Sequence, residues 1–466
     1  MSLCALTLSQ AAADVRDGRA SSVELVTACL DRVTEVDADI QAWAFLDREH
    51  ALAQARTLDE HRAHGRALGP LHGVPVGIKD IFDTGDMPTE LGSPLWAGRT
   101  PRSDAAAVAR LRAAGAVIMG KTVTTEYAYF HPGKTRNPHD PERTPGGSSS
   151  GSAAAVAAHM VPGAIGSQTN GSTIRPAAYC GVVGFKPTHG LIARSGALLL
   201  SRTLDHVGLF ARSVGDVALL AESLAGYDRE DLDTRPVARP PFASVAAGEP
   251  PLPPRFAFVK SPAWEHAEQV TREAFAELAD ALGEAVSEVE LGDGFKRALD
   301  FHSIVMSVEM AHNLHRDYEQ GRAQLSEPLR KLIERGRTHP AVDYTAAVAG
   351  VAPLNASLDS VFDEYDAILT PAAPGEAPKG LAATGNPVFC TIWTYLGVPA
   401  LTLPLLQSEA GRPLGVQLVG RRGNDARLLR TARWLAKTVG KHGRRGRQGA
   451  AAGSKPARGA GKRKAS

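Results

Sequence analysis

Apolar and polar positions alternate over residues 74–78, and this run ends at Lys79. Because alternate residues of a strand share one face, the pattern predicts a strand whose last side chain, that of Lys79, points away from the apolar face. A predicted helix over residues 103–114, closed by Gly115, leads into a second short apolar strand over residues 116–119. Helices and strands continue to alternate along the chain, which is typical of an α/β fold.

A further apolar run, residues 160–167, predicts another short strand, and a tight turn into a helix follows it. Asn170 and Gly171 tolerate unusual backbone angles, so successive N–H groups in such a turn can point to one place. Donors aimed at one point stabilise a developing oxyanion. We therefore predict an oxyanion hole from the backbone of Thr169, Asn170, Gly171 and Ser172, with an ordinary turn and a serine helix cap as the alternative.

A second serine-rich segment, residues 146–152, reads Gly-Gly-Ser-Ser-Ser-Gly-Ser and runs straight into a predicted helix over residues 153–159. A flexible linker has no reason to abut a helix in this way. A nucleophile elbow needs a strand just before it, but residues 135–145 contain three prolines. A phosphate-binding loop needs Lys and then Ser or Thr after its last glycine, and Gly151 is followed by Ser-Ala.

The chain is long for one domain, yet apolar residues, 43% of the 466, are spread evenly and leave no clear internal break. We predict one α/β domain over residues 1–436. Its start is a pair of helices with a capping box at residues 21–24. Residues 228–255, rich in proline and charge, are predicted to leave the regular pattern before a strand at residues 256–259.

The last segment, residues 437–466, holds ten Lys and Arg and no acidic residue. Removing these charges from the formal net charge of +2 leaves −8 for the rest of the chain. With almost no large apolar residue the segment is predicted to be a disordered basic tail. Two roles are left open for this tail: weak, non-specific binding of polyanions, or no role beyond an incidental extension.

Four cysteines stand too far apart for a disulfide framework or a paired-cysteine metal site. The chain shows no basic, apolar leader and no apolar run of membrane-spanning length, so we expect a cytoplasmic protein without a membrane partner. Glu309, His312 and His315 fall on one predicted helix face. Without a second such segment we interpret them as a packed or solvated face and predict no metal site.

Residues 77–80, 146–152 and 169–178, taken together, resemble the amidase signature family. The spacing of 24 residues between Ser148 and Ser172 also matches the family. The resemblance covers nearly all of residues 5–436. It implies an α/β fold with a large, mixed and mostly parallel sheet covered by helices on both faces.

The family's catalytic triad is Ser-cisSer-Lys, and the resemblance carries it onto Ser172 as nucleophile, Ser148 as the bridging serine after a cis peptide, and Lys79 as base. Lys79 must be neutral to accept a proton, so its pKa has to fall from about 10.4 towards about 7 to 8 by burial. Asp80 beside it would oppose that fall, but adjacent strand residues point to opposite faces.

The chain departs from the commonest family pattern at Gln168, Asn170 and Ser150, and none of these changes removes a triad atom. Asn170 places a side chain beside the predicted oxyanion hole, where it can narrow the pocket or bond the substrate. Arg175 lies about one helical turn after Ser172 and suits a substrate carboxylate, with a structural role as the alternative.

The leading hypothesis is a cofactor-independent amidase that hydrolyses a small or aryl carboxylic amide through an acyl-enzyme on Ser172. Its acyl pocket is expected to draw on residues 302–318 and 384–395. The alternatives are the glutaminase (A) subunit of a tRNA-dependent amidotransferase and a catalytically silent or polyanion-binding protein. The expected partner is a small-molecule amide, and a homodimer is left open.

Overall fold

The structure is a computed structural model that describes residues 2–238 and 240–452, with residues 441–452 described by their backbone. Within these residues one mixed sheet contains eleven strands in the order β1-β3-β2-β4-β6-β5-β10-β11-β9-β7-β8. The strands are β1 Trp43–Leu46, β2 Pro75–Lys79, β3 Val117–Thr122, β4 Gly163–Gln168, β5 Val183–Lys186, β6 His206–Ala211, β7 Phe256–Val259, β8 Val286–Val289, β9 Ala367–Pro371, β10 Ala400–Gln407 and β11 Pro413–Val419.

Parallel pairing is confined to two blocks of this sheet, β3-β2-β4 and β9-β7-β8. The other six neighbouring pairs among the described strands are antiparallel. The predicted α/β class and the mixed sheet are confirmed, with parallel pairs fewer than expected. The strand that carries Lys79 and the strand that leads to Ser172 are parallel neighbours, so both segments leave the sheet at one edge.

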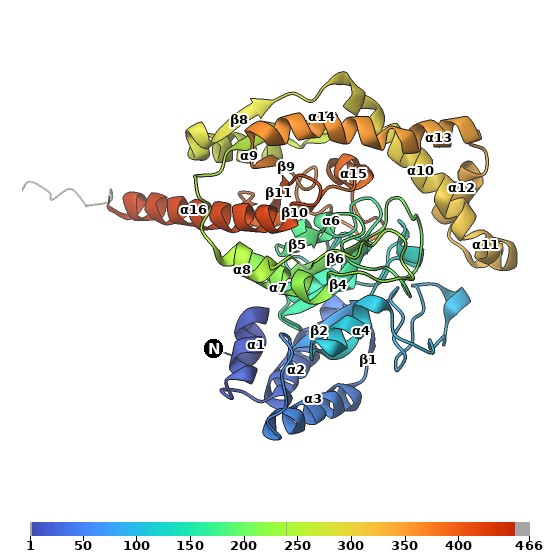
Figure 1. Ribbon diagram of the computed structural model, residues 1–466, viewed down its shortest axis with the longest axis vertical. Helices are drawn as coiled ribbons and strands as arrows, with labels where there is room; N and C mark the ends of the chain where they lie inside the picture. The colour runs from blue at the N-terminus through green and yellow to red at the C-terminus, as the bar shows by residue number, and fades with distance from the viewer. Residues whose placement is uncertain (1, 239, 453–466) are drawn as a thin grey trace, which may run out of the picture.

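The helices are α1 Leu8–Arg16, α2 Ser22–Ile40, α3 Arg48–Ala63, α4 Ala106–Ala113, α5 Ser150–Ala157, α6 Ile174–Tyr179, α7 Val214–Leu224, α8 Phe242–Ala247, α9 Gln269–Leu282, α10 Ala298–Asn313, α11 His315–Gly321, α12 Glu327–Gly336, α13 Ala341–Ala349, α14 Val351–Glu364, α15 Val388–Tyr395 and α16 Asp425–Ala452. Helices α1 to α3 lie at one end of the molecule, and α10 to α14 lie at the other end (Figure 1).

Helices cover both faces of the sheet, as two glycines of β4 show. A side chain added at Gly163 would meet Leu220 of α7, whereas one added at Gly166 would meet Ser149 at the start of α5. Because strand positions an odd number apart point to opposite faces, α7 and α5 cover opposite faces. Helices α8 and α16 pack with α7, and α6 packs on the central strands.

The predicted local signals correspond to real elements. Helix α2 begins at the predicted capping box, in which Ser21 accepts from the backbone of Glu24 and Glu24 accepts from the backbone of Ser21. The predicted strand at residues 256–259 is β7, and α4 and β3 lie within a few residues of their predicted bounds. Residues 228–255 contain only the short helix α8 among described elements, as expected for an irregular segment.

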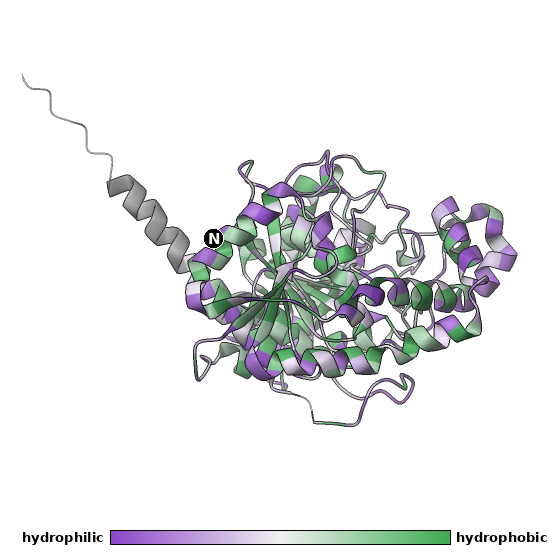
Figure 2. Ribbon diagram, turned by 90° about the horizontal axis from the view of Figure 1, so that it is seen from above, coloured by the Kyte–Doolittle hydropathy of each residue, from purple (hydrophilic) through white to green (hydrophobic). Residues whose placement is uncertain are grey.

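The apolar core lies in the sheet and in the helix faces against it. In Figure 2 the central strands are mostly hydrophobic and the polar residues lie toward the outside. The predicted boundary after residue 436 falls inside α16, and Lys437 forms an ion pair with Glu249. Residues 453–466 of the predicted tail lie outside the described residues, so the disordered tail and its polyanion binding stay predictions.

Candidate active site

Lys79 ends β2 and reaches a small cluster of serines. Its Nζ donates to Ser148 Oγ over 2.7 Å and to Ser167 Oγ over 2.8 Å. Ser167 belongs to β4, and the parallel register that sets Ile78 against Ile165 also brings Ser167 beside the end of β2. The lysine side chain is 0% exposed, so its amine lies in a dry site with two hydroxyls as its acceptors.

Burial holds the pKa of Lys79 well below the ordinary value for a lysine, and the charge of Asp205 opposes part of that shift. Asp80 does not raise the pKa of Lys79, because its side chain points to the other face of the strand and pairs with Lys121 at 3.0 Å. The expectation that neighbouring strand residues face apart is therefore met. The neutral amine that a general base needs is favoured at this position.

The Ser148 loop comes against the end of β4. The peptide bond between Gly147 and Ser148 is cis. The Ser148 carbonyl accepts from the backbone N–H of Thr125 at 3.3 Å, and Ser149 Oγ donates to the Ser167 carbonyl at 3.2 Å. Helix α5 starts immediately afterwards and anchors the loop on the sheet.

Ser172 lies in the turn between β4 and α6, next to the same carbonyl. Thr173 Oγ1 donates to the Ser167 carbonyl at 3.2 Å, so the residues that follow the two predicted catalytic serines, Ser149 and Thr173, share one acceptor. The structure thus brings Lys79, Ser148 and Ser172 into one place. Ser172 is 8% exposed, and within the described residues its hydroxyl has no hydrogen-bond partner.

The loop before Ser172 offers free backbone donors. In the part of the chain that the structure describes, the N–H groups of Asn170, Gly171 and Ser172 donate to no protein acceptor. All three residues line the cavity at Ser172. Unpaired N–H groups that face a cavity are what an oxyanion hole requires.

Thr169 is held from two sides. Its hydroxyl donates to Asp205 Oδ1 at 2.6 Å, and its carbonyl accepts from His302 Nε2 at 2.9 Å. Burial raises the pKa of Asp205 to about 6 and lowers the pKa of His302 to about 4, so the imidazole is neutral and donates its one N–H. Asp205 is itself fixed by the N–H groups of Leu200 and Ser201.

Gln168 and Asn170, the two residues of this loop that depart from the family pattern, both accept hydrogen bonds. Gln168 Oε1 accepts from the N–H groups of Thr173 and Ile174, so it caps the start of α6. Asn170 Oδ1 accepts from Thr391 Oγ1 at 2.7 Å, so the side chain is turned toward α15. Asn170 still lines the cavity.

Arg175 is 2% exposed and lines the same cavity as Ser172. Its Nη2 donates to the Gly147 carbonyl at 2.7 Å and to Thr384 Oγ1 at 3.1 Å. Its Nε and Nη1 are buried without a partner in the described residues. Burial lowers the pKa of this guanidinium, and Tyr179 and Cys390 only partly offset that effect. The side chain therefore both holds the Ser148 loop and keeps two donors unused.

The cavity beside Ser172 has a volume of only about 20 Å³, which is space for about one water. Both segments expected for the acyl pocket contribute to it, through Met306 and Met310 of α10 and through Pro387 before α15. Tyr129 and Phe130 close another side. A substrate must move some of these side chains to enter.

Ser167 and Asp205 were not among the predicted site residues, and His302 was expected only as the first residue of a segment near the acyl pocket. Asp205 belongs to a segment that carries the family resemblance, which was the available signal for it. Glu309, considered above with His312 and His315, instead accepts from Ser201, Thr203 and Tyr344. Among the described residues no group of His, Cys, Asp and Glu is arranged to hold a metal ion, and none of the helices is long and apolar enough to cross a membrane.

Comparison with known proteins identifies a family that this chain matches. The family model described as Amidase matches residues 24–429. Among curated relatives, the A subunit of the glutamyl-tRNA(Gln) amidotransferase of Chloroflexus aggregans is 36% identical, over 94% of this chain and 98% of the relative. The protein of the same name from Anaeromyxobacter sp. (strain K) is 35% identical, over 94% of this chain and 97% of the relative.

Solved structures are similar along almost the whole chain. One, from a vestigial protein complex that reveals the origins of an s-triazine catabolic enzyme, has a TM-score of 0.86 at 29% identity and covers 93% of this chain and 98% of its own. An amidase crystal structure has a TM-score of 0.81 at 32% identity, with 93% and 99% covered. The peptide amidase of Stenotrophomonas maltophilia has a TM-score of 0.81 at 28% identity, with 93% and 97% covered.

Proposed function

Because this chain belongs to the amidase family, whose members hydrolyse C–N bonds, we propose that it is a cofactor-independent amidase acting on a small or aryl carboxylic amide through an acyl-enzyme on Ser172. The observation that carries the proposal is the buried hydrogen bond from Lys79 to Ser148 beside the unpaired hydroxyl of Ser172. A nucleophile, a bridging hydroxyl and a neutral amine are the parts that such chemistry needs.

In the first half-reaction Ser172 Oγ attacks the amide carbonyl carbon. Its proton passes to Ser148, while Ser148 gives its own proton to the neutral amine of Lys79. The carbonyl oxygen becomes an oxyanion within reach of the N–H groups of Asn170, Gly171 and Ser172. Each preorganised donor of this kind lowers the barrier by roughly 3 kcal/mol.

Collapse of the tetrahedral intermediate breaks the C–N bond, and the relay runs backwards so that the leaving amine departs with the proton held by Lys79. Water then attacks the acyl group on Ser172 and gives its proton to the same relay. The products are a carboxylic acid and ammonia or an amine, and Ser172 regains its proton.

The unpartnered Nε and Nη1 of Arg175 support a preference for amides that carry a carboxylate. A buried cation without an acidic partner is unfavourable, and a substrate carboxylate would supply the acceptor that this guanidinium lacks. Arg175 has a second role in this proposal, because its bond to the Gly147 carbonyl positions Ser148.

A second candidate is the glutaminase (A) subunit of an amidotransferase, since the relatives of that kind are 34–36% identical to this chain over nearly its full length. Glutamine is also an amide with a carboxylate, so the same triad and Arg175 would serve it. The two candidates differ in what the isolated chain does.

The test is ammonia release by the purified chain from a panel of free amides, with and without a carboxylate, and from glutamine. Turnover of aryl or other small amides by the chain alone supports the stand-alone amidase. If glutamine is the one amide that is hydrolysed, and if its hydrolysis requires added partner subunits and charged tRNA, the second candidate is the function. Four unpaired, buried cysteines suit a reducing compartment, and we assign the activity to the cytoplasm on that ground.

A further inference from the structure

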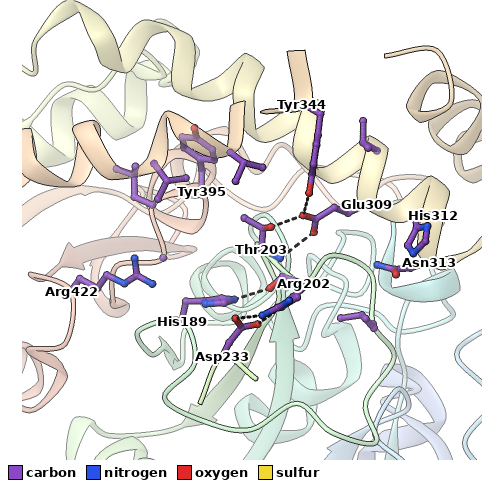
Figure 3. Close-up of a pocket in the computed structure, with 16 residues that line it drawn as sticks. His189, Arg202, Thr203, Asp233, Glu309, His312, Asn313, Tyr344, Tyr395 and Arg422 are labelled. Carbon is purple, nitrogen blue, oxygen red and sulfur yellow. Dashed lines mark hydrogen bonds and ion pairs between the residues drawn. The ribbon is translucent and has the colours of Figure 1, made fainter. Parts of the chain in front are cut away.

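A second and larger pocket lies beside α10. Its volume is about 780 Å³, within the range of about 300 to 1,000 Å³ typical of small-molecule sites. It is enclosed by α10, by the helices α13 and α14, and by loop residues 199–203 and 396–397 (Figure 3). These segments are far apart in the sequence, so the complete fold is needed to form the pocket.

This pocket is separate from the cavity at Ser172. Met306 and Met310 line the Ser172 cavity, whereas Val308 and His312 line the large pocket. Glu309 and Asn313 of α10 also line the large pocket, and no residue lines both spaces. A ligand in the large pocket would not contact the proposed nucleophile.

One part of the wall of the large pocket is apolar and open to solvent. Leu199 is 43% exposed and Val348 is 37% exposed, and both line it together with Val351 and Leu396. Large apolar side chains left open in one concave place mark a binding site rather than ordinary surface. The body of the ligand is therefore apolar.

Two arginines and two carboxylates line this pocket, namely Arg202, Arg422, Asp233 and Glu309. Arg202 is neutralised by Asp233, whose carboxylate it contacts at 3.1 Å. Arg422, across the opening in Figure 3, has no ion pair or hydrogen bond within the described part of the chain. Partial burial and then the neighbouring charge of Arg235 lower its pKa, the charge of Asp233 partly offsets this effect, and the residue remains exposed to solvent. An anion beside Arg422 would relieve both effects.

Within the described residues the acidic groups of the pocket form no ion pair with Arg422, although the charge of Asp233 acts on it from a distance. Glu309 accepts hydrogen bonds from Ser201, from Thr203 and from the Tyr344 hydroxyl, which occupy both its oxygens. Asp233 is shared between Arg194 and Arg202. His189 is neutral, because burial lowers its pKa to about 4. Among the charged residues that line the pocket, Arg422 is thus the one without a hydrogen bond or an ion pair in the described part of the chain.

We propose that this pocket binds an amphipathic carboxylate, with the carboxylate on Arg422 and the apolar chain against Leu199, Val348 and Val351. The site is distinct from the proposed catalytic cavity, and its ligand need not be a substrate. The inference therefore stands whether or not the proposed amidase activity is found.

Isothermal titration of the full chain with octanoate, and in parallel with octylammonium, tests the site. Octanoate binds in a 1:1 ratio, and octylammonium, with the same chain and the opposite charge, does not. Arg422→Met weakens octanoate binding by about tenfold or more, since a charge-assisted bond is lost. The matched control is Arg421→Met, which removes an arginine already paired with Asp363 and leaves octanoate binding unchanged.

Val348→Asp probes the apolar wall, and it is made on an exposed side chain of α13 so that folding is retained. It also abolishes octanoate binding. Equal octanoate affinity in wild type and Arg422→Met would overturn the proposal. Loss of octanoate binding in Arg175→Met alone would also overturn it, because the probe would then lie in the Ser172 cavity. A third contrary result is no octanoate binding together with a dimer that Val348→Asp dissociates, which would make this face a contact between copies of the chain.

Discussion

Lys79 and Ser148 are 69 positions apart in the chain, yet the lysine Nζ donates to the serine Oγ over 2.7 Å in a site closed to solvent. The contact exists because β2 and β4 are parallel neighbours and the Ser148 loop packs on the end of β4. A buried amine that contacts a hydroxyl is placed to exchange a proton with it.

Ser172→Ala removes the proposed nucleophile and is expected to abolish amide hydrolysis, by a factor on the order of 10⁴ or more, with folding intact. Ammonia release measures the rate, and mass spectrometry with a slow substrate detects the acyl adduct in wild type only. Ser357→Ala, which changes an exposed serine of α14, is the control and keeps full activity. An adduct that survives in Ser172→Ala would assign the nucleophile elsewhere.

Lys79 is expected to set the acid limb of the pH–rate profile. Burial lowers its pKa, so the neutral base forms at a lower pH than for an ordinary lysine, and kcat/KM rises as the pH increases through that lowered pKa. Lys79→Met loses both the rate and the limb.

Lys186 offers a matched control, because burial lowers its pKa to about 7 while it donates to the carbonyls of Pro187 and Val398, away from the triad. Lys186→Met is expected to lower stability and keep the limb. If the limb disappears in Lys186→Met and remains in Lys79→Met, the assignment of the base is wrong.

Ser167→Ala tests an acceptor that the structure adds to the site. Lys79 loses one of its two hydroxyl partners, so its amine is oriented less well toward Ser148. We expect kcat to fall by up to about tenfold with little change in KM, since a hydrogen bond between neutral groups contributes roughly 0.5 to 1.5 kcal/mol. Steady-state kinetics separates the two constants, and a change confined to KM would argue against this role.

Arg175→Met is expected to reduce turnover of carboxylate-bearing amides about 10- to 150-fold more than turnover of neutral amides, which corresponds to losing roughly 1.5 to 3 kcal/mol. Neutral amides also slow, because Gly147 loses its donor. Comparing kcat/KM for matched pairs of amides measures the difference. Equal losses on both classes would make the arginine a positioning residue alone.

Asp205→Asn is expected to shift the acid limb to lower pH, since the charge that raises the pKa of Lys79 is removed. Thr169→Val is the matched variant, because it breaks the 2.6 Å bond between the two residues and keeps the charge. It should lower kcat and leave the limb in place. A limb that moves equally in both variants would show that the shift comes from the loop and not from the charge.

Much of this site could be predicted from the sequence, because Lys79 and the two serine segments are local patterns with characteristic spacing. Ser167 could not be found in that way. It contacts Lys79 only through the parallel register of β2 and β4, and pairing between strands some 90 positions apart is not encoded by either segment alone.

His302 shows the same limit for helices. It lies in α10 and reaches the Thr169 carbonyl across 133 positions of sequence, and nothing in its own segment distinguishes it from an ordinary core histidine. The mostly parallel sheet was an implication of the family resemblance, and among the described strands six of the ten neighbouring pairs are antiparallel.

The Ser172 cavity is built by two parts of the chain with different tasks. All groups proposed to move protons or hold the oxyanion lie between Lys79 and Ser172, whereas Met306, Met310 and Pro387 only shape the space. Substitutions at these wall positions can therefore change which amides are accepted while the proposed catalytic groups stay the same. A variant library restricted to these three positions can be screened for new amide specificities, because every variant keeps the same proposed catalytic residues.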